Sequence, residues 1–506
     1  MTKAARAGCP FSDTLVPMLM LLGAPLLVGT AHAASLDNLE IGGPWGSPTA
    51  TDGTAVWWNP AGVAAGHGTR FMLEGAPTFA TINYDRPESE GGPPGGLDTV
   101  KLNGVIPFFG FATDAGVRGL GLGMGVSVPI ARGGAEVDPP GSASYQLISG
   151  QIQAIYAQVA AGYNWNDRIA VGVAGALVHS GWTSTIDSDT LPDLDAAITA
   201  LGQDSGYTDD LLENPDYGTR LSFGQLSDDR FAFSVGLRAQ PVDMLAFGVA
   251  YVSGVRVENT GDVSIQFGCP PQSDAVGRFG MEAYGLCDAV VPADASVGYT
   301  LPGRVQAGLA LFPLPALRIE AMGGYVGWGV FKDYAVAITN AQAATPEGTE
   351  LVNQTRDWAR DNHDSVWAAL DAKGTLADDQ IVLGGRVLYD MAAVPDAALS
   401  MNNYDANTVM LSGLLAARPA RFLELGVSYT HQFIGTRTVT DSAFEMTLDT
   451  ATRKEDRYFY PSANGTYSGS VNRLGVQARF AFGTAGSGAK KSPPREGADA
   501  EPLTGA

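Results

Sequence analysis

Residues 423–430 read Leu-Glu-Leu-Gly-Val-Ser-Tyr-Thr, and residues 474–482 read Leu-Gly-Val-Gln-Ala-Arg-Phe-Ala-Phe. In both stretches every second residue is apolar, and the residues between them are small or polar, two of them charged (Glu424 and Arg479). Since successive side chains of a strand point to opposite faces of a sheet, each stretch predicts a strand with one apolar face. A soluble sandwich could show the same alternation, so the connections between the strands must decide the architecture.

Segments with this alternation recur along the chain, and their connections are alternately short and long. They start near Arg70, Val100, Gly119, Gln146, Arg168, Asp229, Leu245, Asp294, Leu317, Val366, Gln380, Asn407, Phe422 and Thr466. The long connections are residues 86–98, 133–145, 187–228, 260–293, 340–365, 391–406 and 448–465. Short turns at one end and long loops at the other are typical of an outer-membrane barrel, which must close because lipid leaves no partner for backbone groups. The sequence predicts an all-β fold: a transmembrane antiparallel β-barrel of about 14 strands over residues 69–482.

The composition fits this architecture and excludes other classes. Only 17% of the 506 residues are charged, whereas roughly 25% is usual for soluble domains. The net charge of -22 makes the chain a poor partner for nucleic acid, whose phosphates need cations. No apolar run reaches the roughly 20 residues of a spanning helix. The 64 glycines also argue against a compact soluble enzyme.

The two ends of the chain lie outside the predicted barrel. Lys3 and Arg6 precede an apolar stretch at residues 15–29, and Ala31-His32-Ala33 fits a cleavage site. We therefore expect residues 1–33 to be a signal peptide, the alternative being a buried first helix. Residues 483–506 predict a disordered periplasmic tail.

Residues 34–68 are too interrupted by glycine and proline for a strand and too apolar for a free tail. We expect them to form a compact hatch that plugs the barrel and buries Trp57 and Trp58. The residue before a proline is pushed out of the helical region, so Asn59-Pro60, followed by Ala61, should end a short helix.

Three stretches of the sequence resemble the FadL/TodX family of outer-membrane transporters for hydrophobic compounds. Residues 50–64, Ala-Thr-Asp-Gly-Thr-Ala-Val-Trp-Trp-Asn-Pro-Ala-Gly-Val-Ala, are similar to the hatch signature of the family. Tyr389-Asp390, followed by Val394-Pro395-Asp396 and later by residues 425–429, is similar to a second stretch, and Leu301-Pro302 is a weaker third match. The resemblance extends over residues 35–482.

The resemblance implies a fourteen-stranded barrel with a hatch that moves long-chain fatty acids or aromatic hydrocarbons inward. It also implies that cargo leaves sideways, through a gap at a kink of the third strand. Pro129 lies in that strand and cannot donate to a sheet ladder, and Gly133 and Gly134 follow it. By alternation Val128 and Ile130 should face outward. The alternative is a tolerated bulge without a transport role.

Cationic side chains are expected inside the barrel. Alternation turns Arg386, Arg473 and Arg479 inward, where their guanidinium groups could receive a cargo carboxylate. Alternatively, they pair with Glu424 and with hatch carboxylates such as Asp52. Leu194, Ile198 and Leu201 in the third long loop have helical spacing and either capture cargo, as the resemblance implies, or pack over the barrel mouth.

The remaining motifs point away from catalysis and metal binding. Cys269 and Cys287 suggest a loop disulfide in an exported protein, the alternative being two free thiols. The histidines form no Ser-His-acid or H-E-x-x-H pattern, so we expect no enzyme, no metal and no cofactor.

The predicted function is uptake of hydrophobic compounds, most simply long-chain fatty acids, across the outer membrane of a Gram-negative bacterium. The expected partners are apolar cargo, membrane lipid and lipopolysaccharide, with a monomeric barrel and no nucleic acid. The alternatives are uptake of neutral aromatic hydrocarbons by the same route and a passive porin.

Overall fold

The computed structural model describes residues 37–88, 95–137, 141, 143–188, 217–269, 275–444 and 463–483. The predicted signal peptide, residues 484–506 of the predicted tail, and Leu194, Ile198 and Leu201 lie outside the described residues. Within the described part, no helix has the length and apolar character needed to cross a bilayer.

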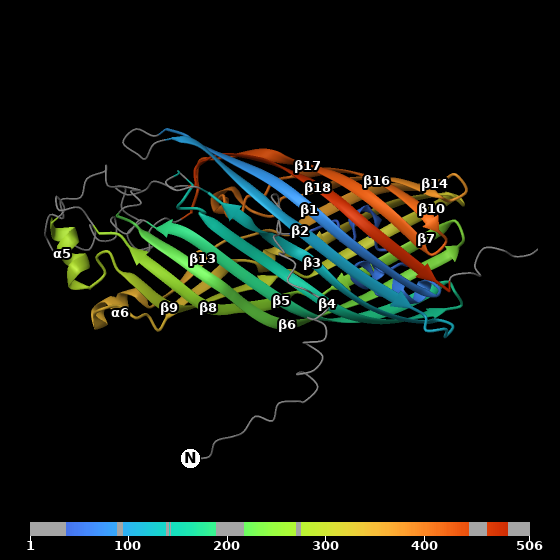
Figure 1. Ribbon diagram of the computed structural model, residues 1–506, viewed down its shortest axis with the longest axis horizontal. Coiled ribbons are helices and arrows are strands. Elements are labelled where there is room, and N and C mark those ends of the chain that lie inside the picture. The colour runs from blue at the N-terminus through green and yellow to red at the C-terminus, as the bar shows by residue number, and fades with distance from the viewer. Residues whose placement is uncertain are drawn as a thin grey trace, which may run out of the picture.

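Eighteen strand segments of the described chain form one sheet that closes into a barrel (Figure 1). They are β1 (Thr69–Arg86), β2 (Gly96–Thr113), β3 (Leu120–Glu136), β4 (Ser149–Trp165), β5 (Ile169–Ser188), β6 (Thr219–Val242), β7 (Leu245–Val252), β8 (Val255–Phe267), β9 (Val290–Leu301), β10 (Arg304–Leu314), β11 (Leu317–Val326), β12 (Asp333–Thr339), β13 (Gln354–Ala359), β14 (Ser365–Leu376), β15 (Ile381–Asp390), β16 (Thr408–Ala420), β17 (Leu423–Val439) and β18 (Gly465–Phe482).

These segments make fourteen barrel strands, because β7 continues into β8, β9 into β10, β11 into β12, and β13 into β14 across short breaks. Neighbours pair antiparallel throughout, and β1 pairs with both β2 and β18, which closes the barrel. The predicted antiparallel barrel of about 14 strands is confirmed. Closure gives each strand of the described chain a neighbour on both sides, as a bilayer requires.

Beyond the bilayer the alternation of the strands inverts. Along β8, Val257, Val263 and Ile265 are buried inside, whereas Glu258 and Asp262 face outward. This is the pattern of a wall with water outside and an apolar interior. The prediction that residues 260–293 and 340–365 are loops throughout was therefore wrong. These ranges contain strand residues as well as the helices α5 (Ala275–Ala283) and α6 (Pro346–Val352). Both helices lie at the same end of the barrel (Figure 1).

The two cysteines lie on either side of α5 and are joined by a disulfide. Their Cα atoms are 4.7 Å apart, which is within the range that a disulfide spans. The bridge ties the end of β8 to the start of β9 beneath the helix.

Residues 37–68, which we call the inner segment, lie inside the barrel and are almost completely buried. The segment contains the turns η1 (Gly43–Trp45), α2 (Ala55–Trp58) and α3 (Gly62–Ala65). Helix α2 ends at Trp58 because Asn59, before Pro60, has an extended backbone with φ -165°. Two further turns, η3 (Trp328–Val330) and η4 (Asp396–Ala398), lie in the break between β11 and β12 and after β15.

Candidate functional site

The tryptophan pair fixes α2 against the barrel wall. The ring of Trp57 meets Tyr156 edge-on at 5.5 Å, and the ring of Trp58 meets Trp367 at 6.0 Å. The indole N–H of Trp58 donates to the carbonyl of Ile41 at 2.8 Å. Both indoles are nearly inaccessible, so the pair joins the inner segment to two distant strands.

The Asn59-Pro60-Ala61 corner is bound both to the inner segment itself and to the wall. The Asn59 amide donates to the carbonyls of Pro48 and Leu237 at 2.9 and 3.0 Å, and its oxygen accepts from the Ala61 N–H at 3.1 Å. A Cβ atom on Gly172 of β5 would lie 2.3 Å from the Pro60 carbonyl carbon. The corner therefore needs a glycine opposite it in the wall.

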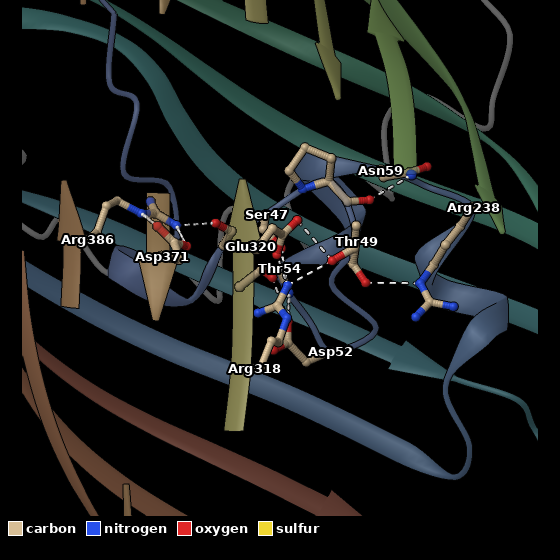
Figure 2. A network of polar contacts seen from close by, with 12 residues as sticks. Ser47, Thr49, Asp52, Thr54, Asn59, Arg238, Arg318, Glu320, Asp371 and Arg386 are labelled. Atoms are coloured by element: carbon tan, nitrogen blue, oxygen red, sulfur yellow. Dashed lines mark hydrogen bonds and ion pairs between the residues drawn. The ribbon is translucent and has the colours of Figure 1, made fainter. Parts of the chain in front are cut away.

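A row of arginines anchors the remainder of the inner segment (Figure 2). Arg386 holds Asp371 through two bonds of 2.7 Å and donates to the Gly46 carbonyl at 2.7 Å. Arg238 donates to the Thr49 carbonyl at 3.0 Å. Asp371 lies on β14, so the Arg386 ion pair belongs to the wall, whereas the bonds to Gly46 and Thr49 exist only while the inner segment stays in place.

Arg473 and Arg479 also contact the inner segment. Arg473 donates to the Asn38 side chain at 2.9 Å, and Arg479 pairs with Asp52 at 3.0 Å. Burial raises the pKa of Asp52, but Arg479 and Thr54 outweigh this and hold it below its usual value. The three arginines singled out for a cargo carboxylate thus have partners already, and their role toward cargo stays a prediction.

The ladder between β2 and β3 is interrupted. It pairs Phe109 with Val126 on one side and Lys101 with Glu136 on the other, leaving residues 102–108 opposite 127–135. The register of β3 against β4 also shifts twice, once across Pro129 and once across Gly133 and Gly134. After the first shift, Val128 and Ile130 are buried, so their predicted outward direction was wrong.

The start of the inner segment lies against this interruption. The Asn38 backbone N–H donates to the Pro129 carbonyl at 2.7 Å, and its side chain donates to the Val128 carbonyl at 3.2 Å. Asp37 bridges Ile130 and accepts a bond of 2.6 Å from Arg304, on β10. Two residues therefore connect the interrupted strand with distant parts of the wall.

Two cavities lie beyond the inner segment, toward the end that carries the long loops. The outer one measures about 110 Å³ and includes Trp358, Leu221 and Ile338. The inner one measures about 30 Å³, and the two share Arg360 and Asn402. Together they lead from the outer rim toward the interrupted strand.

Arg132 and Arg360 are the cations of the inner cavity, and neither forms an ion pair with a carboxylate of the described residues. Arg132 donates to the Met401 carbonyl at 2.5 Å. Arg360 lies 4.8 Å from the Tyr334 ring, its Nε atom has no partner among the described residues, and burial lowers its pKa. Trp328 and Phe331 complete an aromatic wall.

Neither arginine of this pair was among the site residues predicted from the sequence. Arg132 follows the break at Pro129, beyond which alternation no longer predicts whether a side chain points inward or outward. Arg360 lies in a segment predicted as a loop. An arginine directly after the strand break was the available signal for Arg132.

Comparison with known proteins agrees with this architecture. Residues 45–482 match the family described as outer membrane protein transport protein (OMPP1/FadL/TodX). A Pseudomonas aeruginosa FadL homologue is similar in structure, with a TM-score of 0.69 and 15% identity over 90% of this chain and 100% of that chain. No curated protein matches the sequence.

Two toluene transporters are similar as well. The Pseudomonas putida toluene transporter TodX has a TM-score of 0.58 and 15% identity, covering 90% of this chain and 99% of that one. The Ralstonia pickettii toluene transporter TbuX has a TM-score of 0.54 and 15% identity, covering 88% and 99%. At these identities the likeness shows the fold alone.

Proposed function

Because the chain belongs to the OMPP1/FadL/TodX family of outer-membrane transport proteins for hydrophobic compounds, we propose that its cargo is a long-chain fatty acid. In this proposal, the acid enters through the outer and then the inner cavity, passes the inner segment and leaves sideways at Pro129. Each barrel holds the whole route, so a monomer among lipid and lipopolysaccharide suffices.

The observation that carries the choice of cargo is the pair Arg132 and Arg360. Both guanidinium groups are buried beside aromatic rings and share the cavity with Asp405, with which neither forms an ion pair, so a cargo carboxylate could form the direct charge-assisted bonds that they lack. The rings of Trp328, Phe331 and Tyr334 offer an apolar surface for the alkyl chain. A neutral hydrocarbon could form no ion pair with either arginine.

The exit rests on the interruption between β2 and β3. Backbone groups that lack a ladder partner cannot face lipid, and Asn38 satisfies the carbonyls of Val128 and Pro129 from inside. When the inner segment withdraws, this part of the wall loses its partner and can part from β2. Arg386, Arg473 and Arg479 then lose Gly46, Asn38 and Asp52 as partners, which leaves N–H groups that can donate to the carboxylate as it leaves.

Substitution of the arginine pair tests the proposal. Arg132→Gln with Arg360→Gln should weaken oleate binding at least tenfold, since a charge-assisted bond contributes about 1.5–3 kcal/mol. Toluene binding should change less than twofold. The control is Arg230→Gln, an exposed arginine paired with Asp228 on the outer surface. Binding measured by calorimetry in detergent would contradict the proposal if oleate and toluene weakened equally.

Uptake of neutral aromatic hydrocarbons is the second candidate, and the same aromatic wall favours it. In that case the arginine pair should be dispensable and Phe331→Ala should weaken toluene binding. Capture by Leu194, Ile198 and Leu201 remains part of the proposal, although these residues lie outside the described part of the chain. A passive porin is disfavoured because the inner segment fills the lumen.

A further inference from the structure

We propose a second lateral opening in the barrel wall, between residues 299–303 and residues 327–334, through which apolar compounds dissolved in the outer leaflet enter the inner cavity. This inference rests on the proposed function, because it assigns that cavity to cargo. It adds an entrance from the membrane to the entrance from water.

The wall lacks a regular ladder at this place. The ladder between β9 and β12 ends at the pair Gly298 and Ala335. The ladder between β10 and β11 begins at the pair Arg304 and Val326. Between them the shorter range 299–303 faces the longer range 327–334, where the Gly327 N–H donates to the Gly303 carbonyl at 2.9 Å. The interruption between β2 and β3 has the same form, with unequal ranges between two regular ladders.

The outward-facing residues place the membrane-side edge of the opening at the membrane boundary. Tyr251, Val305 and Tyr325 are neighbours in one row across three strands, and they are 40%, 42% and 46% exposed. Tyrosines on the outer face of a barrel gather where lipid meets water. The opening begins in the rows directly beyond them, and the exposed Val330 lies beside it.

Aromatic side chains close the opening. The ring of Tyr299 stacks on Phe331 at 5.4 Å and meets Tyr334 edge-on at 5.3 Å, and all three are buried. Rotation of side chains can part such a closure, and the one backbone bond that the described residues place across it, from Gly327 to Gly303, is all that must break. A regular ladder would have to lose several backbone bonds at once.

The cavity directly behind the rings is the one that holds the arginine pair. Phe331 and Tyr334 line both the closure and this cavity, and Arg132 of β3 lies on it as well. The second opening and the Pro129 interruption therefore flank a single cavity. A compound could enter from the outer leaflet on one side and leave on the other.

Cross-linking the two sides of the opening tests the proposal. Thr300→Cys with Asp333→Cys places thiols on outward-facing, partly exposed positions of β9 and β12, for bridging with a bis-maleimide. Val305→Cys with Tyr325→Cys is the matched control, because these residues are already paired in a regular ladder. Cys269 and Cys287 are oxidised and do not react.

Uptake is measured in a porin-deficient Gram-negative host without its own fatty-acid transporter. Palmitate partitions into the outer leaflet, whereas octanoate stays largely in water and has the same carboxylate. Bridging residues 300 and 333 should lower palmitate uptake at least fivefold and change octanoate uptake less than twofold. Bridging the control pair should change neither.

An unchanged palmitate uptake, or an equal loss of both acids, would overturn the second opening while leaving the proposed function standing. A wild-type protein that carries neither acid would overturn the proposed function and the opening with it.

Discussion

At the residue scale, the wall glycines record where the inner segment touches the barrel. A Cβ atom on Gly121 would lie 2.3 Å from the Ala64 backbone, and one on Gly248 would lie 2.1 Å from the Pro48 carbonyl. No residue with a side chain fits at such distances. Part of the high glycine content therefore reflects the close fit of the inner segment.

Two glycines of β5 give a matched test of this fit. Gly172→Ala should lower the free energy of unfolding by about 1–3 kcal/mol, because the new methyl group overlaps Pro60. Gly175→Ala, on the outward face of the same strand with nothing within 4 Å, should leave it unchanged. Urea unfolding in detergent measures both, and equal effects would mean that the contact with Pro60 is unimportant.

Asp405, on the long loop after β15, lines the inner cavity and makes the stability of the protein sensitive to pH. Burial raises its pKa to about 7, against the opposing effect of the N–H groups of Ala393 and Val394. The folded state therefore binds this proton more tightly than the unfolded state. The free energy of unfolding should fall as pH rises from about 4 to about 7, by about 1.4 kcal/mol for each step of one in pH.

Asp405→Asn removes the titrating group and keeps an oxygen that accepts the two N–H bonds. The variant should lose stability less steeply than the wild type between about pH 4.5 and about pH 7.5, the two slopes differing by up to about 1.4 kcal/mol for each step of one in pH. Chemical unfolding at several pH values measures the slope. A wild-type slope retained by Asp405→Asn would assign the effect to another group.

The predictions at this scale succeeded where alternation holds and failed where it breaks. Arg386 and Arg473 face inward as expected, because the ladders next to them are regular. Val128 and Ile130 differ because a register shift after Ser127 reverses the direction of each following side chain. No rule on sequence spacing places Arg132 beside Arg360, since their meeting depends on how the barrel closes.

At the scale of elements, the contact between the inner segment and β3 is the step that we expect to control exit. Asp37→Cys with Ile130→Cys joins two residues that already bridge. The oxidised variant should bind oleate normally, but its oleate uptake should be at least tenfold slower than that of the wild type. Reduction of the disulfide should restore uptake. Leu73→Cys with Ala478→Cys, paired within the ladder between β1 and β18, is the control. Uptake retained after verified oxidation would exclude this exit.

The extended strands beyond the bilayer could also have been predicted. The stretch 255–267 alternates as clearly as any membrane strand, with the apolar residues on the inner face. A local pattern does not say which face of a strand points into the barrel. If apolar residues are expected on the outer face only, this stretch is assigned to a loop. The open ladders around residues 299–303 and 327–334 have no local signature apart from Pro302 and the glycines.

At the scale of the whole molecule, strand number and closure followed from the sequence because lipid imposes them. A membrane sheet must alternate, must close and must turn tightly on its periplasmic side, and each requirement leaves a pattern along the chain. The packing of the inner segment leaves no comparable pattern. Its contacts join Asp37 to Arg304 and Trp58 to Trp367, which are far apart in sequence.

The central claim is that a filled barrel passes hydrophobic acids and excludes water-soluble solutes. Purified protein in liposomes tests it most directly, by comparing entry of oleate, reported by a trapped fatty-acid sensor, with sugar-driven swelling. Oleate should enter well above its rate into protein-free vesicles, and small sugars should cause no swelling. Rapid swelling without faster oleate entry would show an open aqueous pore and contradict it.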